Sequence, residues 1–226
     1  MSTIVFARDS EMVQHICWQD PAFVRLADAV GDVYLTYRRD PFPSLVRSII
    51  GQQVTGKSAQ ATWERLLAQC AEAEPRRLPA AQCSTNGICL PEIIEAMDEE
   101  SLRAAGLSRQ KISYVKDLSR KVLSRDIDLE GLSNMPDDQV VAVLTRVKGI
   151  GVWTAKMYMI FTLGRFDVFA PSDLGLRKGA MWLYNLPRLP KEKTLLELSQ
   201  KWKPFRTVAA LYLWQAVTRG FTKRLS

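Results

Sequence analysis

One short stretch, Val147-Lys148-Gly149-Ile150-Gly151-Val152-Trp153-Thr154-Ala155, separates two apolar segments of the chain. Before it, apolar residues recur at helical spacing after Pro136, which suits a first helical turn. After it, residues 152–163 are apolar nearly all round, as in a helix that is buried on most sides. The two glycines favour a tight turn, because glycine accepts positive φ angles and close backbone approach. The sequence therefore predicts a helix, a glycine hairpin and a second helix over residues 136–163.

Such a hairpin can bind phosphate. A tight turn that opens a helix leaves N–H groups pointing outward at the positive end of the helix dipole, where a phosphate oxygen is stabilised. Contacts of this kind position DNA without reading its sequence. From the glycines alone, an ordinary corner between two helices is the more common explanation, because short glycine motifs are weak signals.

A single acidic residue follows the second predicted helix. Pro171 and Ser172 are typical of a turn and a helix N-cap, and they place Asp173 in the first turn of the next helix. An Asp in that position is often no more than a carboxylate that stabilises a helix start. The alternative is that Asp173 is catalytic, and this alternative depends on the rest of the pattern.

These segments together resemble the helix-hairpin-helix-Gly/Pro/Asp superfamily of DNA glycosylases, and within it the 3-methyladenine DNA glycosylase II (AlkA-type) family. The resemblance extends to Phe42–Val54 around Gly51-Gln52-Gln53, to Leu107–Lys111 and to Trp202–Trp214. It covers about residues 40–220 in the order and spacing typical of the family. It implies an all-α fold of two helical lobes, with the helix-hairpin-helix motif and an active-site cleft between the lobes.

We expect one glycosylase unit over residues 1–226. Lobe A is expected at about 35–165, including the motif at 136–163, and lobe B at 1–34 plus 166–226. The resemblance leaves no room before residue 20 for the β-rich domain of longer relatives, and the sequence shows no sustained alternating β pattern. Three further helices are expected over Pro43–Val54, Lys57–Cys70 and Arg109–Leu123, and a long surface loop over Ala71–Pro91.

The resemblance assigns the chemistry to one carboxylate, Asp173. It would stabilise positive charge on the deoxyribose and guide water to C1′, because an alkylated purine is already a good leaving group. Whether Asp173 also takes the proton of that water stays open. A cationic base over an indole face gains about 0.5–2 kcal/mol, which favours damaged bases. The residues implied to form the base pocket are Trp153, Trp214 and Met157, although both tryptophans could instead be core residues.

Trp153 has a second implication. Relatives that also nick the strand carry a lysine nucleophile at this position, so the resemblance implies a monofunctional hydrolase without lyase activity. Gln53 is implied to fill the gap that a flipped base leaves in the duplex, unless it only forms a hydrogen-bonding turn between helices. The residues expected to contact DNA phosphate are Lys148, Gly149, Gly151 and Thr154. A structural monovalent cation is implied on the backbone carbonyls of Thr145, Val147 and Ile150.

Composition agrees with DNA as the partner. The net charge is +7, and residues 165–226 hold 12 Lys or Arg against 4 Asp or Glu. With 47% apolar residues the chain can form a sizeable core, and no run is long enough for a membrane span. The four cysteines, Cys17, Cys70, Cys83 and Cys89, lack metal-site spacing, and none follows Asp173, so no iron–sulfur cluster is expected. The single His15 excludes sites that need several histidines.

The sequence thus predicts a base-excision repair glycosylase for alkylated purines of the 3-methyladenine and 7-methylguanine type, which leaves an abasic site. It would act as a monomer on damaged double-stranded DNA, with no membrane partner and no cofactor, in the bacterial cytoplasm or a nucleus. A glycosylase for neutral lesions, such as hypoxanthine or etheno adducts, is one alternative. A non-catalytic protein that binds DNA damage is another.

Overall fold

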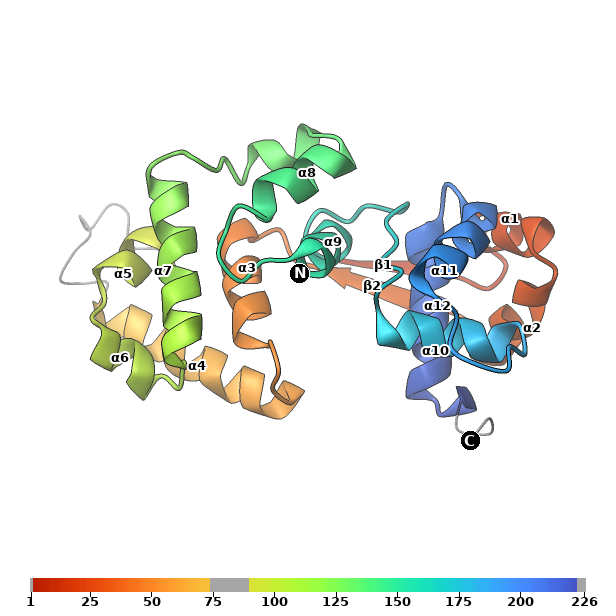
Figure 1. Ribbon diagram of the computed structural model, residues 1–226, viewed down its shortest axis with the longest axis horizontal. Coiled ribbons are helices and arrows are strands. Elements are labelled where there is room, and N and C mark those ends of the chain that lie inside the picture. Colours follow the sequence, from red (N-terminus) through yellow and green to blue (C-terminus); the bar gives the residue numbers. More distant parts are fainter. Residues whose placement is uncertain (1, 74–89, 223–226) are drawn as a thin grey trace. The chain divides into compact units, whose positions relative to one another are not determined.

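The computed structural model describes residues 2–73 and 90–222, which divide between two compact units (Figure 1). One unit is Asp40–Ala155, and the other combines Met1–Arg39 with Lys156–Ser226. The division therefore falls after residues 39 and 155, whereas we expected it near 34 and 165. Most of the described chain is helical, which confirms the predicted all-α class.

The Asp40–Ala155 unit is built around one long helix, α7 (Arg109–Leu123). Helices α3, α5 and α6 pack against it, and α4 packs against α3 and α5. The other elements of this unit are α3 (Pro41–Ile50), α4 (Gly56–Ala73), α5 (Pro91–Ala96), α6 (Glu99–Ala104), the 3-10 helix η3 (Gly131–Asn134) and α8 (Asp137–Leu144).

Helix α7 has the bounds that the sequence predicts, because its signals are local. The Ser108 hydroxyl accepts the Lys111 amide at 3.3 Å and so caps the first turn. Ile112, Val115 and Leu118 are buried as expected, but Leu123, the last residue of the helix, is 41% exposed. Both ends of the predicted loop over 71–91 are helical, since α4 continues to Ala73 and α5 begins at Pro91. Residues 74–89, which include Cys83 and Cys89, lie outside the described residues.

The second unit surrounds helix α12 (Arg206–Thr218), which is buried along most of its length. Helices α1, α2 and α10 and strand β2 all contact α12. The elements of this unit are β1 (Ser2–Phe6), α1 (Glu11–Gln19), α2 (Ala22–Val30), β2 (Val33–Tyr37), α10 (Leu174–Leu183), α11 (Glu192–Leu198) and the 3-10 helix η4 (Ser199–Trp202). Helix α9 (Val152–Phe161) begins in the first unit and continues into the second.

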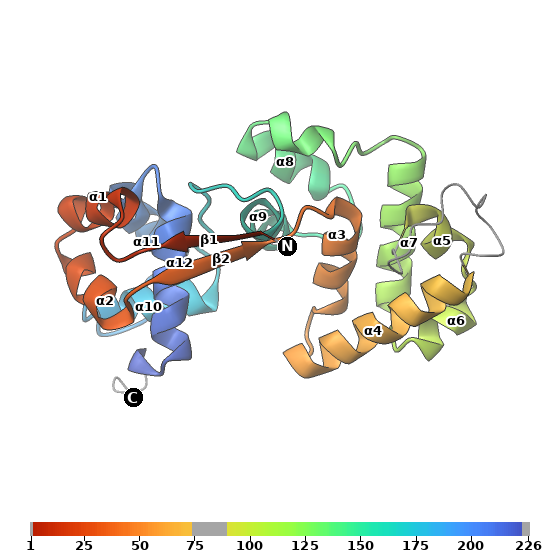
Figure 2. The ribbon, with the colours of Figure 1, turned by 180° about the vertical axis from the view of Figure 1, so that it is seen from behind.

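The structure also contains a two-stranded antiparallel sheet, although the sequence shows no sustained alternating β pattern. Strands β1 and β2 lie side by side (Figure 2), with Ser2 opposite Tyr37 and Phe6 opposite Val33. In β2, Val33 and Leu35 are buried while Tyr34 is exposed, which is the alternation of a half-buried strand. Five residues per strand are too few for a sustained pattern, and the partner strand lies about thirty positions away.

Neither a membrane span nor a disulfide is found in the part of the chain that the structure describes. Within residues 2–73 and 90–222, no helix is both long and apolar enough to cross a bilayer. Cys17 and Cys70 are both buried, and Cys17 is a free thiol. Burial raises the pKa of the Cys17 thiol, which keeps it protonated at neutral pH.

Candidate active site

The glycine hairpin, residues 147–151, joins α8 to α9 as the sequence predicts. Gly149 has a φ of 80°, and a Cβ added there would lie 2.1 Å from Cδ2 of the Tyr114 ring. Any other residue at 149 would therefore strain the backbone and displace Tyr114. Gly151 has neither a positive φ nor a close neighbour, so the expectation that both glycines meet this need is wrong for Gly151. Helix α8 also ends at Leu144, one turn before the hairpin.

The hairpin presents backbone amides to solvent. Lys148 and Gly151 are exposed, and Gly149 is half-buried. Within the described residues, the amides of Gly149 and Gly151 donate to no other group of the protein. The Lys148 amide instead donates to Oδ2 of Asp117 at 2.9 Å. The hairpin thus offers two glycine amides and the Lys148 side chain to an anion, while the Lys148 amide serves to anchor the turn.

Asp117 lies on α7, where it forms an ion pair with Lys121 at 2.7 Å. Burial alone would raise the pKa of Asp117, but the hydrogen bonds from Lys121 and the Lys148 amide outweigh it, so the pKa lies below its usual value. The carboxylate therefore stays charged at neutral pH. The sequence analysis did not identify this anchor, because Asp117 and Lys148 lie 31 positions apart.

Residues 51–55 form the turn after α3. We call it the wedge turn, because it carries Gln53, the residue that the family resemblance implies fills the gap left by a flipped base. Gln53 in this turn is exposed and has a φ of 56°. This value lies in the left-handed region, which residues other than glycine rarely adopt. Such strained residues persist only where their surroundings hold them, and they gather at functional sites. Its neighbour Gln52 donates from Nε2 to the carbonyl of Gly149 at 2.8 Å. The predicted turn between helices therefore exists. Its hydrogen bond comes from the side chain of Gln52, whereas the sequence analysis considered Gln53 for this role.

The first turn of α9 carries two of the predicted site residues, and they differ in exposure. Trp153 is 45% exposed, so it is not a core residue. Thr154 is only 6% exposed, so little of its surface is open to a phosphate. Met157 is partly buried one turn later.

Asp173 is the N-cap of α10, one position later than the sequence analysis placed the cap. Its Oδ1 accepts the Leu176 amide at 2.9 Å, so Asp173 rather than Ser172 caps the helix. The same Oδ1 accepts the indole N–H of Trp214 at 2.9 Å. Two donors thereby fix the orientation of the carboxylate. Gly175 permits this approach, because a Cβ there would lie 3.0 Å from Cδ1 of Trp214.

Trp214 comes from α12, and its ring stacks on Phe161, with ring centroids 5.9 Å apart and an angle of 30° between the planes. Phe161 is 37% exposed at the end of α9. The structure thus brings Asp173, Trp214 and Phe161 together. Sequence reasoning missed Phe161, although it follows Trp153 and Met157 at the four-residue spacing that places side chains on one face of a helix.

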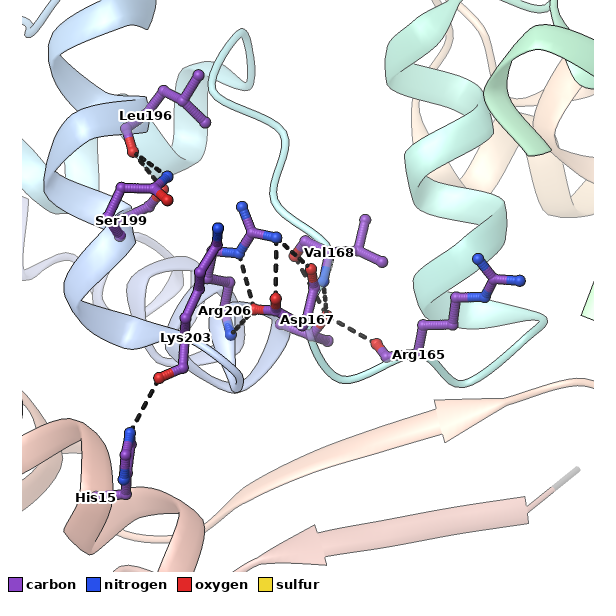
Figure 3. Close-up of polar contacts among 10 residues, drawn as sticks. His15, Arg165, Asp167, Val168, Leu196, Ser199, Lys203 and Arg206 are labelled. Atoms are coloured by element: carbon purple, nitrogen blue, oxygen red, sulfur yellow. Dashed lines mark hydrogen bonds and ion pairs between the residues drawn. The ribbon is translucent and has the colours of Figure 1, made fainter. Parts of the chain in front are cut away.

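The segment before Asp173 is fastened to the first turn of α12, as Figure 3 shows. The Arg206 guanidinium donates to both carboxylate oxygens of Asp167, at 2.7 and 3.0 Å, and this geometry is bidentate. The buried Thr207 hydroxyl donates to the carbonyl of Arg165 at 2.8 Å and accepts the Val168 amide at 3.0 Å. These contacts tie the segment that leads to Asp173 to the helix that carries Trp214.

The chain is similar in sequence to known DNA repair proteins. Residues 46–204 match the model of the HhH-GPD superfamily of base excision DNA repair proteins. The chain is 34% identical over 207 residues to DNA-3-methyladenine glycosylase 1 of Schizosaccharomyces pombe, which covers 89% of this chain and 84% of that protein.

Two solved structures are similar over almost the whole chain. DNA-3-methyladenine glycosidase from Bacillus halodurans has a TM-score of 0.84 at 35% identity, covering 97% of this chain and 94% of that one. Schizosaccharomyces pombe Mag1 in complex with abasic DNA has a TM-score of 0.75 at 32% identity, and the match covers 92% of this chain and 97% of that one. A fixed carboxylate, a neighbouring aromatic stack and a glycine hairpin are thus found in a chain that belongs to the HhH-GPD superfamily of base excision DNA repair proteins.

Proposed function

We propose that the protein is a monofunctional DNA glycosylase that hydrolyses the N-glycosidic bond of alkylated purines, with Asp173 as its catalytic residue. The observation that carries this proposal is the Asp173 carboxylate, which is held by two hydrogen bonds beside the stacked rings of Trp214 and Phe161. Its relatives include proteins named DNA-3-methyladenine glycosylase or glycosidase, which supports an alkylated purine as the substrate.

Asp173 acts through its charge and its fixed position. When the bond to a cationic 3-methyladenine or 7-methylguanine breaks, the base leaves as a neutral molecule and positive charge develops on the deoxyribose. A carboxylate that is already oriented stabilises that charge without reorganisation. Water then adds to C1′ and loses a proton, which gives an abasic site. Because the departing base needs no added proton, one carboxylate is sufficient.

The aromatic side chains provide selectivity for damaged bases. An alkylated purine that carries a positive charge is attracted to an indole face by about 0.5–2 kcal/mol, and a normal base lacks this attraction. Trp214 and Phe161 supply one such surface, and Trp153 is exposed enough to supply another. Met157 is proposed to complete the pocket wall in place of a ring.

Double-stranded DNA is the proposed partner, bound by a monomer. The amides of Gly149 and Gly151 and the Lys148 side chain would contact a backbone phosphate, which positions the duplex without reading its sequence. Gln53 would fill the space left by the flipped nucleotide. Its exposure and its left-handed backbone support this role.

A monovalent cation is proposed to stabilise the hairpin from the carbonyls of Thr145, Val147 and Ile150. The donor set fits such an ion, because the Val147 carbonyl accepts only the Ile150 amide, at 3.1 Å, within the described residues and keeps a second lone pair. Hydrolysis itself needs only water, so no redox cofactor is proposed.

Release of free base from methylated duplex DNA tests the proposal. We expect the wild type to release 3-methyladenine or 7-methylguanine and to leave sites that break only in alkali. Asp173→Asn should lower the rate by at least about a hundredfold while DNA binding persists, because the amide oxygen still accepts both hydrogen bonds but carries no charge. An active Asn variant would rule out the assigned role.

Borohydride trapping tests the absence of lyase activity. Trp153 has no amine to attack C1′, so no covalent adduct with DNA should form. If the wild type released hypoxanthine or an etheno adduct but no methylated purine, the substrate class would change to neutral lesions. If it bound damaged DNA without releasing any base, the protein would be a damage-binding protein.

A further inference from the structure

Helix α7 contacts both loops that are proposed to touch DNA in the Asp40–Ala155 unit. Lys111, Tyr114 and Asp117 recur every three residues along one side of α7. The Lys111 ammonium donates to the carbonyl of Ile50, at the end of α3, at 2.7 Å. Tyr114 covers Gly149, and Asp117 accepts the Lys148 amide. One helix therefore supports the start of the wedge turn and the glycine hairpin.

The two loops are also joined directly, by Gln52. Its amide nitrogen donates to the Gly149 carbonyl at 2.8 Å, across 97 positions of the sequence. Gly149 presents one of the two amides available to a phosphate, and Gln52 precedes the strained Gln53. Gln52 is half-buried, so its side chain is partly shielded from competing water. This hydrogen bond therefore links the backbone of the hairpin to the residue directly before Gln53.

We propose that Gln52 is a positioning residue that couples the wedge turn to the glycine hairpin, so that phosphate binding at the hairpin sets how Gln53 enters the duplex. This inference rests on the proposed function, because it requires both loops to meet DNA. It assigns Gln52 no contact with the damaged base. Its effect passes through Gln53, and this dependence can be measured.

A double-mutant cycle tests the coupling. The affinities of wild type, Gln52→Met, Gln53→Ala and the double variant are measured for a duplex with one tetrahydrofuran abasic analogue and for the same duplex intact. Gln52→Met keeps the length of the side chain but cannot donate a hydrogen bond. We expect it to reduce the preference for the abasic duplex about fivefold, the effect of one net hydrogen bond. Gln53→Ala should then cause no further loss in the Gln52→Met background.

Gln60→Met is the matched control. Gln60 lies in the same unit and donates its amide to Glu64 at 2.7 Å on the exposed side of α4. It should bind both duplexes as the wild type does. If Gln52→Met unfolds, Gln52→Asn replaces it, because the shorter amide cannot span the same distance.

Additive losses in the cycle, or a Gln52→Met variant that behaves like Gln60→Met, would overturn the coupling. Base release from methylated DNA is measured on the same preparations. Additive losses together with normal base release would reject the coupling and leave the proposed function intact. A wild type with neither base release nor preference for the abasic duplex would reject both.

Discussion

At the scale of single residues, Trp214 combines two properties. Its ring stacks on Phe161, while its indole N–H donates to Asp173. A tryptophan can do both because it has a large apolar face and one polar edge. The same side chain therefore orients the carboxylate and can also form part of the proposed pocket wall.

Trp214→Phe separates these two properties. The phenyl ring keeps an aromatic face but loses the donor, and a hydrogen bond to a charged group contributes about 1.5–3 kcal/mol. We expect kcat for release of 3-methyladenine to fall at least about tenfold, with a smaller change in KM. Trp182→Phe is the control, since Trp182 lies in the same unit and packs against Phe221. Equal losses in both variants would contradict an orienting role.

Gln53→Gly should separate stability from function. The left-handed backbone at φ 56° costs an L-residue about 1–2 kcal/mol, and glycine avoids that cost but gains chain entropy in the unfolded state. We expect the melting temperature to stay equal or rise, while the preference for abasic over intact DNA falls. Thermal unfolding and duplex titration measure the two effects. A lower melting temperature would show that Gln53 stabilises the turn.

At the scale of elements, the hairpin depends on a charge carried by α7. The pKa of Asp117 is lowered in the folded protein, so its stabilising contribution is complete above the unfolded pKa of about 3.9 and is lost as the pH falls through the folded value. Asp117→Asn keeps an oxygen for the Lys148 amide but loses the ion pair with Lys121.

The free energy of unfolding in urea, measured between pH 2 and pH 7, tests this dependence. Wild type should exceed Asp117→Asn above about pH 4, and the difference should shrink below it. Asp98→Asn is the control: the pKa of Asp98 is lowered by hydrogen bonds from Ser101, but Asp98 caps α6 and does not touch the hairpin. Only Asp117→Asn should also weaken DNA binding. A pH-independent difference for Asp117→Asn would contradict the assignment.

The elements that sequence analysis predicts best are those with local signals. The N-cap Ser108 and the apolar spacing along α7 lie within one segment, and so do the hairpin glycines. The Trp214 hydrogen bond to Asp173 and the Gln52 hydrogen bond to Gly149 join residues 41 and 97 positions apart. A local sequence pattern cannot reveal a contact between residues that are so far apart in the chain. The resemblance to a family pointed to Asp173 and Trp214, but not to the bond between them.

At the scale of the whole molecule, a buried carboxylate holds the two chain segments of one unit together. Asp20, between α1 and α2, is 2% exposed and accepts the Tyr184 hydroxyl at 2.5 Å and the Trp202 indole N–H at 3.0 Å. Burial first, then the hydrogen bond and the charge of Asp20, raise the pKa of Tyr184 far above its usual value. The phenol therefore remains a donor at any physiological pH.

Tyr184→Phe removes one of these two donors. Loss of one hydrogen-bond partner of a buried carboxylate lowers the free energy of unfolding by about 1–3 kcal/mol. For a chain of this size, each kcal/mol lowers the melting temperature by about 2–4 °C. We expect a lower melting temperature with normal base release per folded molecule, measured by calorimetry and by the excision assay. Tyr34→Phe, on the exposed side of β2, should leave the melting temperature unchanged.

The unit that surrounds α12 is formed by two chain segments that are synthesised at different times. Helices α1 and α2 and strand β2 are synthesised long before α12, the helix against which they pack, which begins only at Arg206. At roughly 5–20 residues per second, about 10–30 s pass before their partner emerges. Residues 40–155 are consecutive and can pack during that interval. The side of this segment that packs against α12 stays uncovered meanwhile, and exposed apolar surface of this kind favours binding by a chaperone.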